Sequence, residues 1–300
     1  MKDSKQYTTV GVCIVVILMF FTYGYVEIFS VPKNFPIGKN FTVGENENLK
    51  SVSKRLENGG YITSPLLFRA GISFFGKDRE IQLGGYVFDK PESLAHIVDI
   101  FVKGHPSSPL LSVTIPEGST SFEIASIITK VLPGVTKDML SQTIAQYNAD
   151  GRLFPSTYFL LPSNTAEDIV KLMLYTFSKK VAPLSAALIP SPLTTEHDVL
   201  VLASILEGEA KSGDDMKIVS GILLARLTKG MLLQVDVAKE TYKNKGLPKI
   251  PINNPGLTAI DAVLHPILSN YLYYITGDDE KMYYAKTFEE HKRNIRKYLK

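Results

Sequence analysis

The stretch that decides the fold is Val199–Ala210, which reads VLVLASILEGEA. Apart from Ser204, every residue as far as Leu206 is hydrophobic or alanine. A helix of that composition is buried on most of its sides. The run ends in two acids, Glu207 and Glu209. Carboxylates are rarely buried without a partner or a chemical task. Either acid is therefore a candidate proton donor at the floor of a cleft, and solvation at a helix end is the competing interpretation.

The segments after this stretch predict a second helix, a strand and a loop. Met216–Leu227 is a second helical run, separated from the first by the polar break Lys211–Asp214. The pattern of Gly230–Asp236, GMLLQVD, is typical of a strand that ends in an acid. Leu247–Gly256, LPKIPINNPG, contains three prolines, two asparagines and a glycine. That composition predicts a loop with fixed turns.

The rest of this half alternates short strands and helices. Thr120 and Glu123 match a capping box at the start of one helix, and Thr287 can cap the last one. A turn at Gly277–Glu280 joins two strands into a hairpin. The expected helices are 121–131, 136–147, 165–180, 258–263 and 287–299, and the expected strands are 111–115, 271–276 and 282–285.

Residues 31–108 predict a small α+β module. A linker that bears Pro and Gly, 31–42, leads into a strand, and a second strand is expected at 81–88. An amphipathic helix at 46–58 ends at Gly59-Gly60, in the pattern of a C-cap. Two further helices are expected, at 65–75 and 93–103.

Residues 6–26 carry no charge, and their length is close to the ~20 residues that span a bilayer as a helix. Lys2 and Lys5 precede this run, which predicts that the N-terminus is cytoplasmic. A cleavable signal peptide is the competing interpretation, but no small-x-small cleavage site follows. We therefore expect a retained single-pass anchor, with everything from about Phe29 outside the cytoplasm.

Composition argues against several classes of function. The formal net charge is +3 with no basic cluster, so nucleic acid is not an implied partner. The single cysteine, Cys13, allows no intrachain disulfide. The five histidines show no metal-binding spacing, and no phosphate-binding or dinucleotide glycine motif is present. We expect neither a metal nor a cofactor.

Several separate stretches resemble one family of proteins. In chain order they include TIPEG at Thr114–Gly118, LFPSTY at Leu153–Tyr158, LASILEGEA at Leu202–Ala210, RLTKGMLLQVD at Arg226–Asp236, NPG at Asn254–Gly256 and AKTFEEHKRNIRKY at Ala285–Tyr298. Each is short, but their common order covers essentially the whole chain. In this respect the chain is similar to the membrane-anchored endolytic murein transglycosylases of bacteria, the YceG-like family.

The resemblance implies an α+β protein in three parts. Residues 1–30 would be a cytoplasmic tip and transmembrane anchor, 31–108 a LysM-like α+β module, and 109–300 a mixed α/β catalytic domain. It also implies a place in the cytoplasmic (inner) membrane, peptidoglycan glycan strands as substrate, and wall-synthesis enzymes as possible partners.

The resemblance further implies a lyase reaction. Such proteins cut the β-1,4 bond between N-acetylmuramic acid and N-acetylglucosamine inside a strand, and leave a 1,6-anhydro ring. The family's catalytic glutamate aligns with Glu207. Its pKa must be raised by desolvation if it is to protonate the leaving oxygen. The 6-hydroxyl of the same sugar then attacks as an internal nucleophile and returns a proton to the carboxylate.

Spacing helps to choose between the two acids. Glu207 and Glu209 lie about 200° apart around a helix, so only one can face the cleft. Small neighbours on its face, among them Ser204, favour Glu207, and Glu209 could instead pair with a base such as Arg226. The candidate substrate-binding residues are Glu209, Gln234, Asp236, Asn254 and Tyr158.

Two departures from the family pattern keep other functions open. The segment 237–245 is shorter than usual, and Ser156 stands where an acid is usual. One alternative is a non-catalytic peptidoglycan-binding protein. Another is a hydrolytic muramidase that uses Glu207 and Asp236 as a pair of carboxylates.

Overall fold

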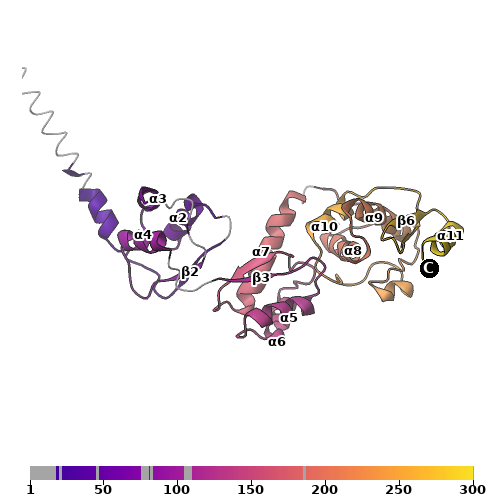
Figure 1. Ribbon diagram of the computed structural model, residues 1–300, viewed down its shortest axis with the longest axis horizontal. Helices are drawn as coiled ribbons and strands as arrows, with labels where there is room; N and C mark the ends of the chain where they lie inside the picture. Colours follow the sequence, from indigo (N-terminus) through magenta and orange to yellow (C-terminus); the bar gives the residue numbers. More distant parts are fainter. Residues whose placement is uncertain are drawn as a thin grey trace, which may run out of the picture. The chain divides into compact units, whose positions relative to one another are not determined.

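The chain divides into two compact units (Figure 1). The first unit comprises residues up to Leu111 together with Phe159–Pro162, and the second comprises Ser112–Tyr158 and Ser163–Lys300. The computed structural model describes residues 18–19, 22–44, 47–75, 81, 84–104, 110–184 and 187–299.

The predicted membrane span at 6–26 lies mostly outside the described residues. Within the described part, residues 22–29 are helical. No helix among the described residues is both long and apolar enough to cross a bilayer.

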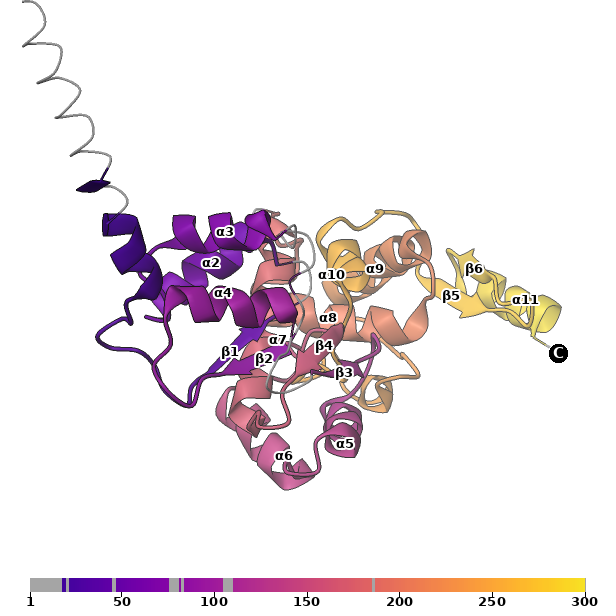
Figure 2. The ribbon, with the colours of Figure 1, turned by 60° about the vertical axis from the view of Figure 1, so that its left-hand side comes forward.

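The first unit packs three helices with one pair of strands (Figure 2). Strand β1 pairs antiparallel with β2, in a register that runs from Asn40 opposite Val87 to Val43 opposite Gly84. Each helix begins where a side-chain oxygen of the preceding residue accepts a backbone N–H of its first turn. The elements are β1 (Asn40–Val43), α2 (Leu49–Asn58), α3 (Pro65–Phe74), β2 (Gly84–Val87) and α4 (Leu94–Lys103).

Aromatic rings fill the core of the first unit. The Tyr86 ring on β2 stacks on Phe101 of α4, with centroids 4.2 Å apart. Phe68 of α3 meets the same Phe101 ring edge-on at 5.4 Å. All three side chains are almost fully buried, so they join the strand pair to two of the helices.

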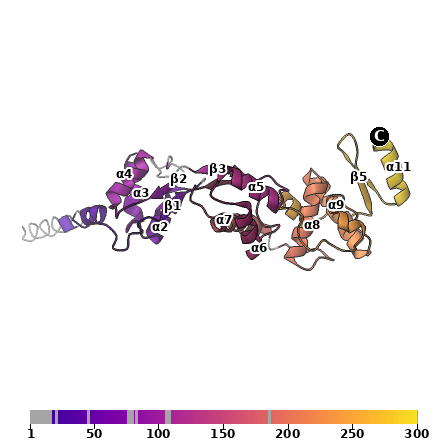
Figure 3. The same cartoon turned by 90° about the horizontal axis from the view of Figure 1, so that it is seen from below.

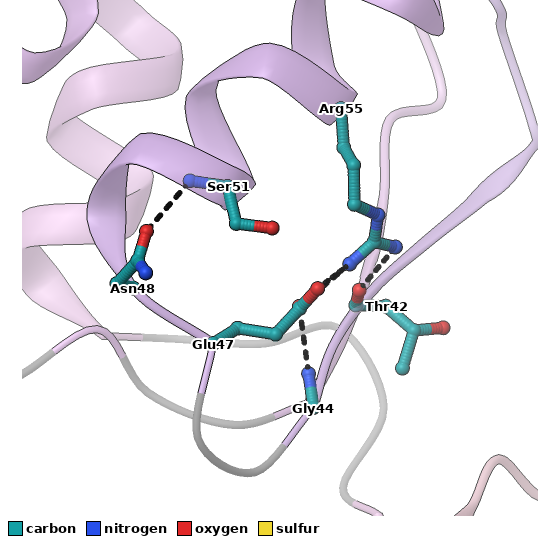
Figure 4. Close-up of polar contacts among 6 residues, drawn as sticks. All are labelled: Thr42, Gly44, Glu47, Asn48, Ser51 and Arg55. Carbon is teal, nitrogen blue, oxygen red and sulfur yellow. Dashed lines mark hydrogen bonds and ion pairs between the residues drawn. The ribbon is translucent and has the colours of Figure 1, made fainter. Parts of the chain in front are cut away.

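A polar contact ties α2 to β1 at the surface (Figure 4). The Arg55 guanidinium lies 2.5 Å from the Glu47 carboxylate and donates to the Thr42 carbonyl at 2.8 Å. Glu47 also accepts the N–H of Gly44 at 3.1 Å. Exposed ion pairs of this kind are worth about 0–1 kcal/mol, so the aromatic core stabilises the unit more than this contact does.

The second unit begins with strand β3, and its first helices follow. β3 pairs with β4 in a two-stranded sheet (Figure 2), α5 packs on α6, and α6 packs on α7. The capping box of Thr120 and Glu123 is confirmed at the start of α5. The elements are β3 (Leu111–Thr114), α5 (Ser121–Val131), α6 (Lys137–Gln146), β4 (Thr157–Leu160), α7 (Ala166–Val181) and the short 3-10 turn η1 (Ala182–Leu184).

The centre of the second unit is α8 (Glu196–Glu209), which is packed against α9 (Gly213–Thr228) and α10 (Leu257–Leu264). A capping box of Thr195 and Asp198 begins α8. Every residue from Val199 to Leu206 is buried. The helix is therefore enclosed on all sides rather than amphipathic, as its composition predicts.

A small C-terminal substructure completes the second unit. Strands β5 (Tyr273–Thr276) and β6 (Met282–Ala285) form the expected antiparallel hairpin. Helix α11 (Phe288–Tyr298) packs on both strands, as Figure 3 shows for β5. Its predicted cap at Thr287 is confirmed as a capping box with Glu290.

The predicted strand at Gly230–Asp236 is wrong, because this segment is irregular and Gln234 has a φ of +50°. The backbone N–H groups of Gln234 and Val235 bond to Thr241 in the short 3-10 turn η2 (Lys239–Tyr242) instead of to a neighbouring strand. The α+β class is confirmed. The described part of the chain is mostly helical, and its strands form pairs only.

The enclosure of α8 predicts a large cost for truncating its side chains. Leu202→Ala should lower the free energy of unfolding by about 2–5 kcal/mol, since Leu202 is fully buried and a cavity remains. Urea unfolding of the full chain measures this. Leu188→Ala is the control, because that side chain is 89% exposed. Equal effects of the two substitutions would contradict the central place of α8.

Candidate active site

Glu207 lies in the last turn of α8, directly after the buried turns. Its carboxylate accepts a hydrogen bond at 2.8 Å from the N–H of Gly256, the N-cap residue of α10. The N-terminus of a helix carries partial positive charge and favours an anion. The carboxylate is thus held between the end of one core helix and the start of another.

Three causes act on the pKa of Glu207, and together they raise it. Burial of the carboxyl group is the largest cause and raises the pKa, because the charged form loses solvation. The hydrogen bond from Gly256 lowers the pKa, and the negative charge of Glu117 raises it again. A carboxyl with a raised pKa keeps its proton to higher pH, which is the property that a general acid needs.

Glu117 brings a second carboxylate to the same place. A Cβ atom at Gly256 would lie only 2.1 Å from Glu117 Oε1, so the absence of a side chain lets this carboxylate approach. On the other side, a Cβ at Gly118, where φ is +73°, would lie 3.3 Å from Glu207 Cγ. Glu117 belongs to the TIPEG motif, but the motif alone does not indicate this role, because only folding brings Glu117 to the start of α10.

Asn254 joins three of the short motifs in one network. Its Oδ1 accepts the N–H of Leu153 at 2.8 Å, and its Nδ2 donates to the Ser119 carbonyl at 3.0 Å. The Asn254 carbonyl accepts the N–H of Gly118 at 3.1 Å. The side chain is 1% exposed. Its contacts position the loops around Glu207, and its predicted contact with substrate stays a prediction.

The loop 247–256 fills the face of α8 that carries the small neighbour Ser204 of Glu207. Ser204 is fully buried, and its hydroxyl accepts the N–H of Ile252 at 3.0 Å. Asn253 Nδ2 donates to the Ser204 carbonyl at 2.9 Å. These contacts fix the position of the loop 247–256, which leads to Gly256.

Glu209 has a different environment from Glu207. Its carboxylate accepts the Tyr274 hydroxyl at 3.1 Å and lies 3.5 Å from the N–H of Val237. Burial is the largest cause that raises its pKa. The suggested ion pair with Arg226 is not formed, because that guanidinium donates to the carbonyls of Leu233 and Leu272 at 2.5 and 2.7 Å.

A cleft of about 500 Å³ opens beside Glu209, and we call it the Glu209 cleft. It brings together three of the sequence-predicted residues, whereas Glu207, Asn254 and Tyr158 do not line it. Residues that line it include Glu209, Gln234, Asp236, Tyr242, Tyr273 and His291.

Tyr158 is buried in β4, where its hydroxyl donates to the Phe154 carbonyl at 2.5 Å. Burial raises the pKa of this phenol. Its predicted contact with sugar stays a prediction. In the part of the chain that the structure describes, no three His, Cys, Asp or Glu side chains are grouped so as to hold a metal ion.

The chain belongs to the YceG-like family, whose sequence profile matches residues 41–239 and 240–297. A crystal structure of a YceG-like protein from Listeria monocytogenes shares the fold. It superposes with a TM-score of 0.54 at 24% identity, and covers 85% of this chain and 98% of that one.

Two relatives bear the name endolytic murein transglycosylase. The one from Streptococcus pneumoniae strain D39 is 28% identical, over 84% of this chain and 57% of its own length. The one from Bacillus subtilis strain 168 is 25% identical, over 93% of this chain and 90% of its own length. The chain thus spans a little over half the length of the pneumococcal relative.

The Asn254 network predicts a structural cost when its side chain is removed. Asn254→Ala leaves the buried N–H of Leu153 without an acceptor, so the free energy of unfolding should fall by about 1–3 kcal/mol. Thermal unfolding measures this. The exposed Asn244→Ala is the matched control. An unchanged melting temperature for Asn254→Ala would show that the network does not hold the loops.

Proposed function

We propose that the chain is an endolytic murein transglycosylase that cuts glycan strands without water and leaves 1,6-anhydro ends. Membership of the family and the names of the relatives support this proposal. The observation that carries it is the half-buried Glu207 carboxyl, with its raised pKa, at the N-terminus of α10.

The first step of the proposed reaction is protonation of the leaving oxygen by Glu207. One Glu207 oxygen is held by Gly256, and the other has no hydrogen bond among the described residues. That second oxygen is the one that can carry the proton toward the substrate. As the bond breaks, the negative charge left on Glu207 is stabilised by the Gly256 N–H and the positive end of α10.

The second step is ring closure within the N-acetylmuramic acid residue, whose C1 is left electron-poor when the glycosidic bond breaks. Its own 6-hydroxyl attacks that carbon, and Glu207 takes the hydroxyl proton and returns to its starting state. The intramolecular nucleophile has a high effective concentration relative to water. One carboxylate therefore serves as acid and then as base, and no second catalytic carboxylate is required.

Glu207 is a better candidate for this role than Glu209. Both acids have a raised pKa because both are buried. The Tyr274 hydroxyl donates to one Glu209 oxygen, and the other faces the Val237 N–H. These contacts occupy the carboxylate, whereas Glu207 keeps one oxygen without a protein partner.

We further propose that residues 31–108, which belong to the first unit, are a LysM-like module that binds glycan, and that residues 6–26 anchor the chain in the cytoplasmic membrane. The charge-free run with lysines before it supports the anchor. The second unit would then lie outside the cytoplasm, where peptidoglycan and wall-synthesis enzymes are found.

The muramidase alternative needs Glu207 and Asp236 as a pair. Asp236 instead lines the Glu209 cleft, and its carboxylate accepts the Tyr242 hydroxyl at 2.8 Å. The contacts of the two acids are therefore with different segments, and this observation favours the transglycosylase.

The reaction predicts products that are one water lighter than hydrolytic ones. The full chain, incubated with uncrosslinked glycan strands, should release 1,6-anhydro ends that mass spectrometry detects. Glu207→Gln should lower the rate by about 10²–10⁴-fold, since it removes the general acid.

Glu209→Gln is the matched control for that substitution and should retain more activity than Glu207→Gln. Reducing ends in the products would establish a hydrolase. Strands that bind but stay intact with the unaltered chain would establish a binding protein.

The nearness of Glu117 predicts a shift of the pH profile. Glu117→Gln removes a negative charge that raises the pKa of Glu207, so that pKa should fall. Glu207 would then lose its proton at lower pH. The alkaline limb of the pH profile of kcat should therefore shift to lower pH. Activity well below that limb should be retained.

The control is the exposed Glu240→Gln, which should leave the limb where it is. If the alkaline limb of the pH profile of kcat stays in place in Glu117→Gln, or if activity falls equally at every pH, Glu117 does not act through the pKa of Glu207.

A further inference from the structure

We propose that one side of α3 contacts the lipid bilayer at the level of the headgroups, beside the point where the chain leaves the membrane. The residues on this side are Leu66, Ala70, Phe74 and Phe75, and we call them the α3 face. The inference goes beyond the proposed function and rests on one part of it, the anchor at residues 6–26. The proposed reaction plays no part in it.

The α3 face is apolar and exposed. Leu66 is 67% exposed, Phe74 is 84% exposed and Phe75 is 56% exposed. Leu66, Ala70 and Phe74 are spaced four residues apart, so they form one stripe along the helix. The sequence of α3 contains one charged residue, Arg69, and its guanidinium donates to a side chain of α2. A continuous apolar surface of this kind indicates contact with a protein or a membrane.

A groove of about 440 Å³ adjoins the α3 face. Ala70 and Phe75 of the face line it, so the two surfaces are continuous. Its other wall is α4, which contributes Val98 among other apolar residues. Ile28, in the helical segment 22–29, lines the same groove (Figure 2). The segment that follows the predicted membrane span therefore lies directly beside the α3 face.

Contacts on both sides of Ile28 hold this segment to the first unit. The Ile28 side chain packs against the buried core of the unit. The Thr63 hydroxyl donates to the Glu27 carboxylate at 2.6 Å. Further along the chain, Phe35 is itself part of the same core. The position of the segment 22–29 relative to α3 is thus fixed by packing and by a hydrogen bond.

This position sets the distance of the groove from the membrane. The charge-free run ends at Val26, and Ile28 lies two residues later, which is about 3 Å along the axis of a helix. The chain is helical across this point. The headgroup region on each side of a bilayer is roughly 5–8 Å thick. With residues 6–26 in the bilayer, the groove and the α3 face lie at the depth of the headgroups.

Both elements carry exposed aromatic pairs. In the segment 22–29, the rings of Tyr25 and Phe29 have centroids 4.7 Å apart. At the end of α3, the rings of Phe74 and Phe75 meet edge-on at 5.3 Å. All four side chains are exposed. Aromatic side chains are enriched at the boundary between membrane and water, so both pairs suit this depth.

The charges beside the groove indicate an apolar contact with lipid. Asp99 is the charged residue that lines the groove, and its carboxylate accepts Nζ of Lys103 at 2.6 Å. The paired charges leave no net attraction for anionic headgroups. The contact should therefore form on neutral lipid, with the apolar side chains inserted about 5–10 Å into the boundary between headgroups and acyl chains.

A single tryptophan can report this contact, because the sequence contains none. Phe74→Trp in the full chain places the fluorophore on the α3 face, and its melting temperature should stay unchanged because Phe74 is exposed. The variant is reconstituted in phosphatidylcholine vesicles with or without bromine on the acyl chains, which quenches tryptophan on contact. Bromine should lower its fluorescence at least about twofold, as expected of a side chain inserted at the boundary.

Lys54→Trp is the matched control. Lys54 is exposed on α2 of the same unit, where other exposed side chains, such as those of Lys50 and Glu57, are charged. This surface is expected to face water. The fluorescence of Lys54→Trp should therefore be the same in both kinds of vesicle.

The anchor is tested separately in the same vesicles, by flotation after an alkaline wash that removes peripheral proteins. A chain that stays with the vesicles, with Phe74→Trp unquenched or quenched no more than Lys54→Trp, would overturn the α3 face and leave the anchor standing. A chain that is washed off, after selective quenching of Phe74→Trp, would leave the α3 face standing without the anchor.

A protein partner gives a different result from lipid. If a second copy of the chain covered the α3 face, the emission of Phe74→Trp would shift to shorter wavelength without quenching by bromine. That result would also overturn the contact with the bilayer.

Discussion

The arrangement of the second unit depends on one contact, the 2.8 Å hydrogen bond between the Glu207 carboxylate and the N–H of Gly256. A carboxylate at the end of a helix buried on all sides has little water to solvate it, and it needs a donor that cannot move away. The N–H of Gly256, the N-cap residue of α10, meets this need. The loop 247–256 is held against α8 by Ser204, and it sets where that N–H lies.

The same arrangement makes the fold less stable as the pH rises. The pKa of Glu207 is raised in the folded chain, so the folded state keeps a proton that the unfolded state has lost. The free energy of unfolding therefore falls as the pH rises from the pKa of Glu207 in the unfolded chain to its pKa in the folded chain. Above the folded pKa the loss is complete. Glu117 adds to this cost through its negative charge. The two carboxylates around Gly256 therefore lower the stability of the fold at higher pH.

Glu207 and Glu209 are similar in sequence and differ in surroundings. Glu207 meets a helix N-terminus and a second carboxylate, whereas Glu209 meets a tyrosine hydroxyl in an aromatic cleft. The end of α8 thus places its two acids in different surroundings, although they are only two positions apart. The short 237–245 segment helps to form the Glu209 cleft, because Thr241 accepts the backbone N–H of Gln234 and Tyr242 donates to Asp236.

Local patterns in the sequence determined most of the helices, their caps and the C-terminal hairpin, because side-chain periodicity and capping chemistry act between near neighbours. They also indicated the buried helix that carries Glu207. They did not predict the irregular path of Gly230–Asp236, whose hydrogen bonds go to η2 rather than to a strand. The meeting of Glu117, Glu207 and Gly256, and the network of Asn254, were decided only by the tertiary structure. Those residues lie up to 139 positions apart in the sequence, and the approach of their side chains depends on how distant segments pack.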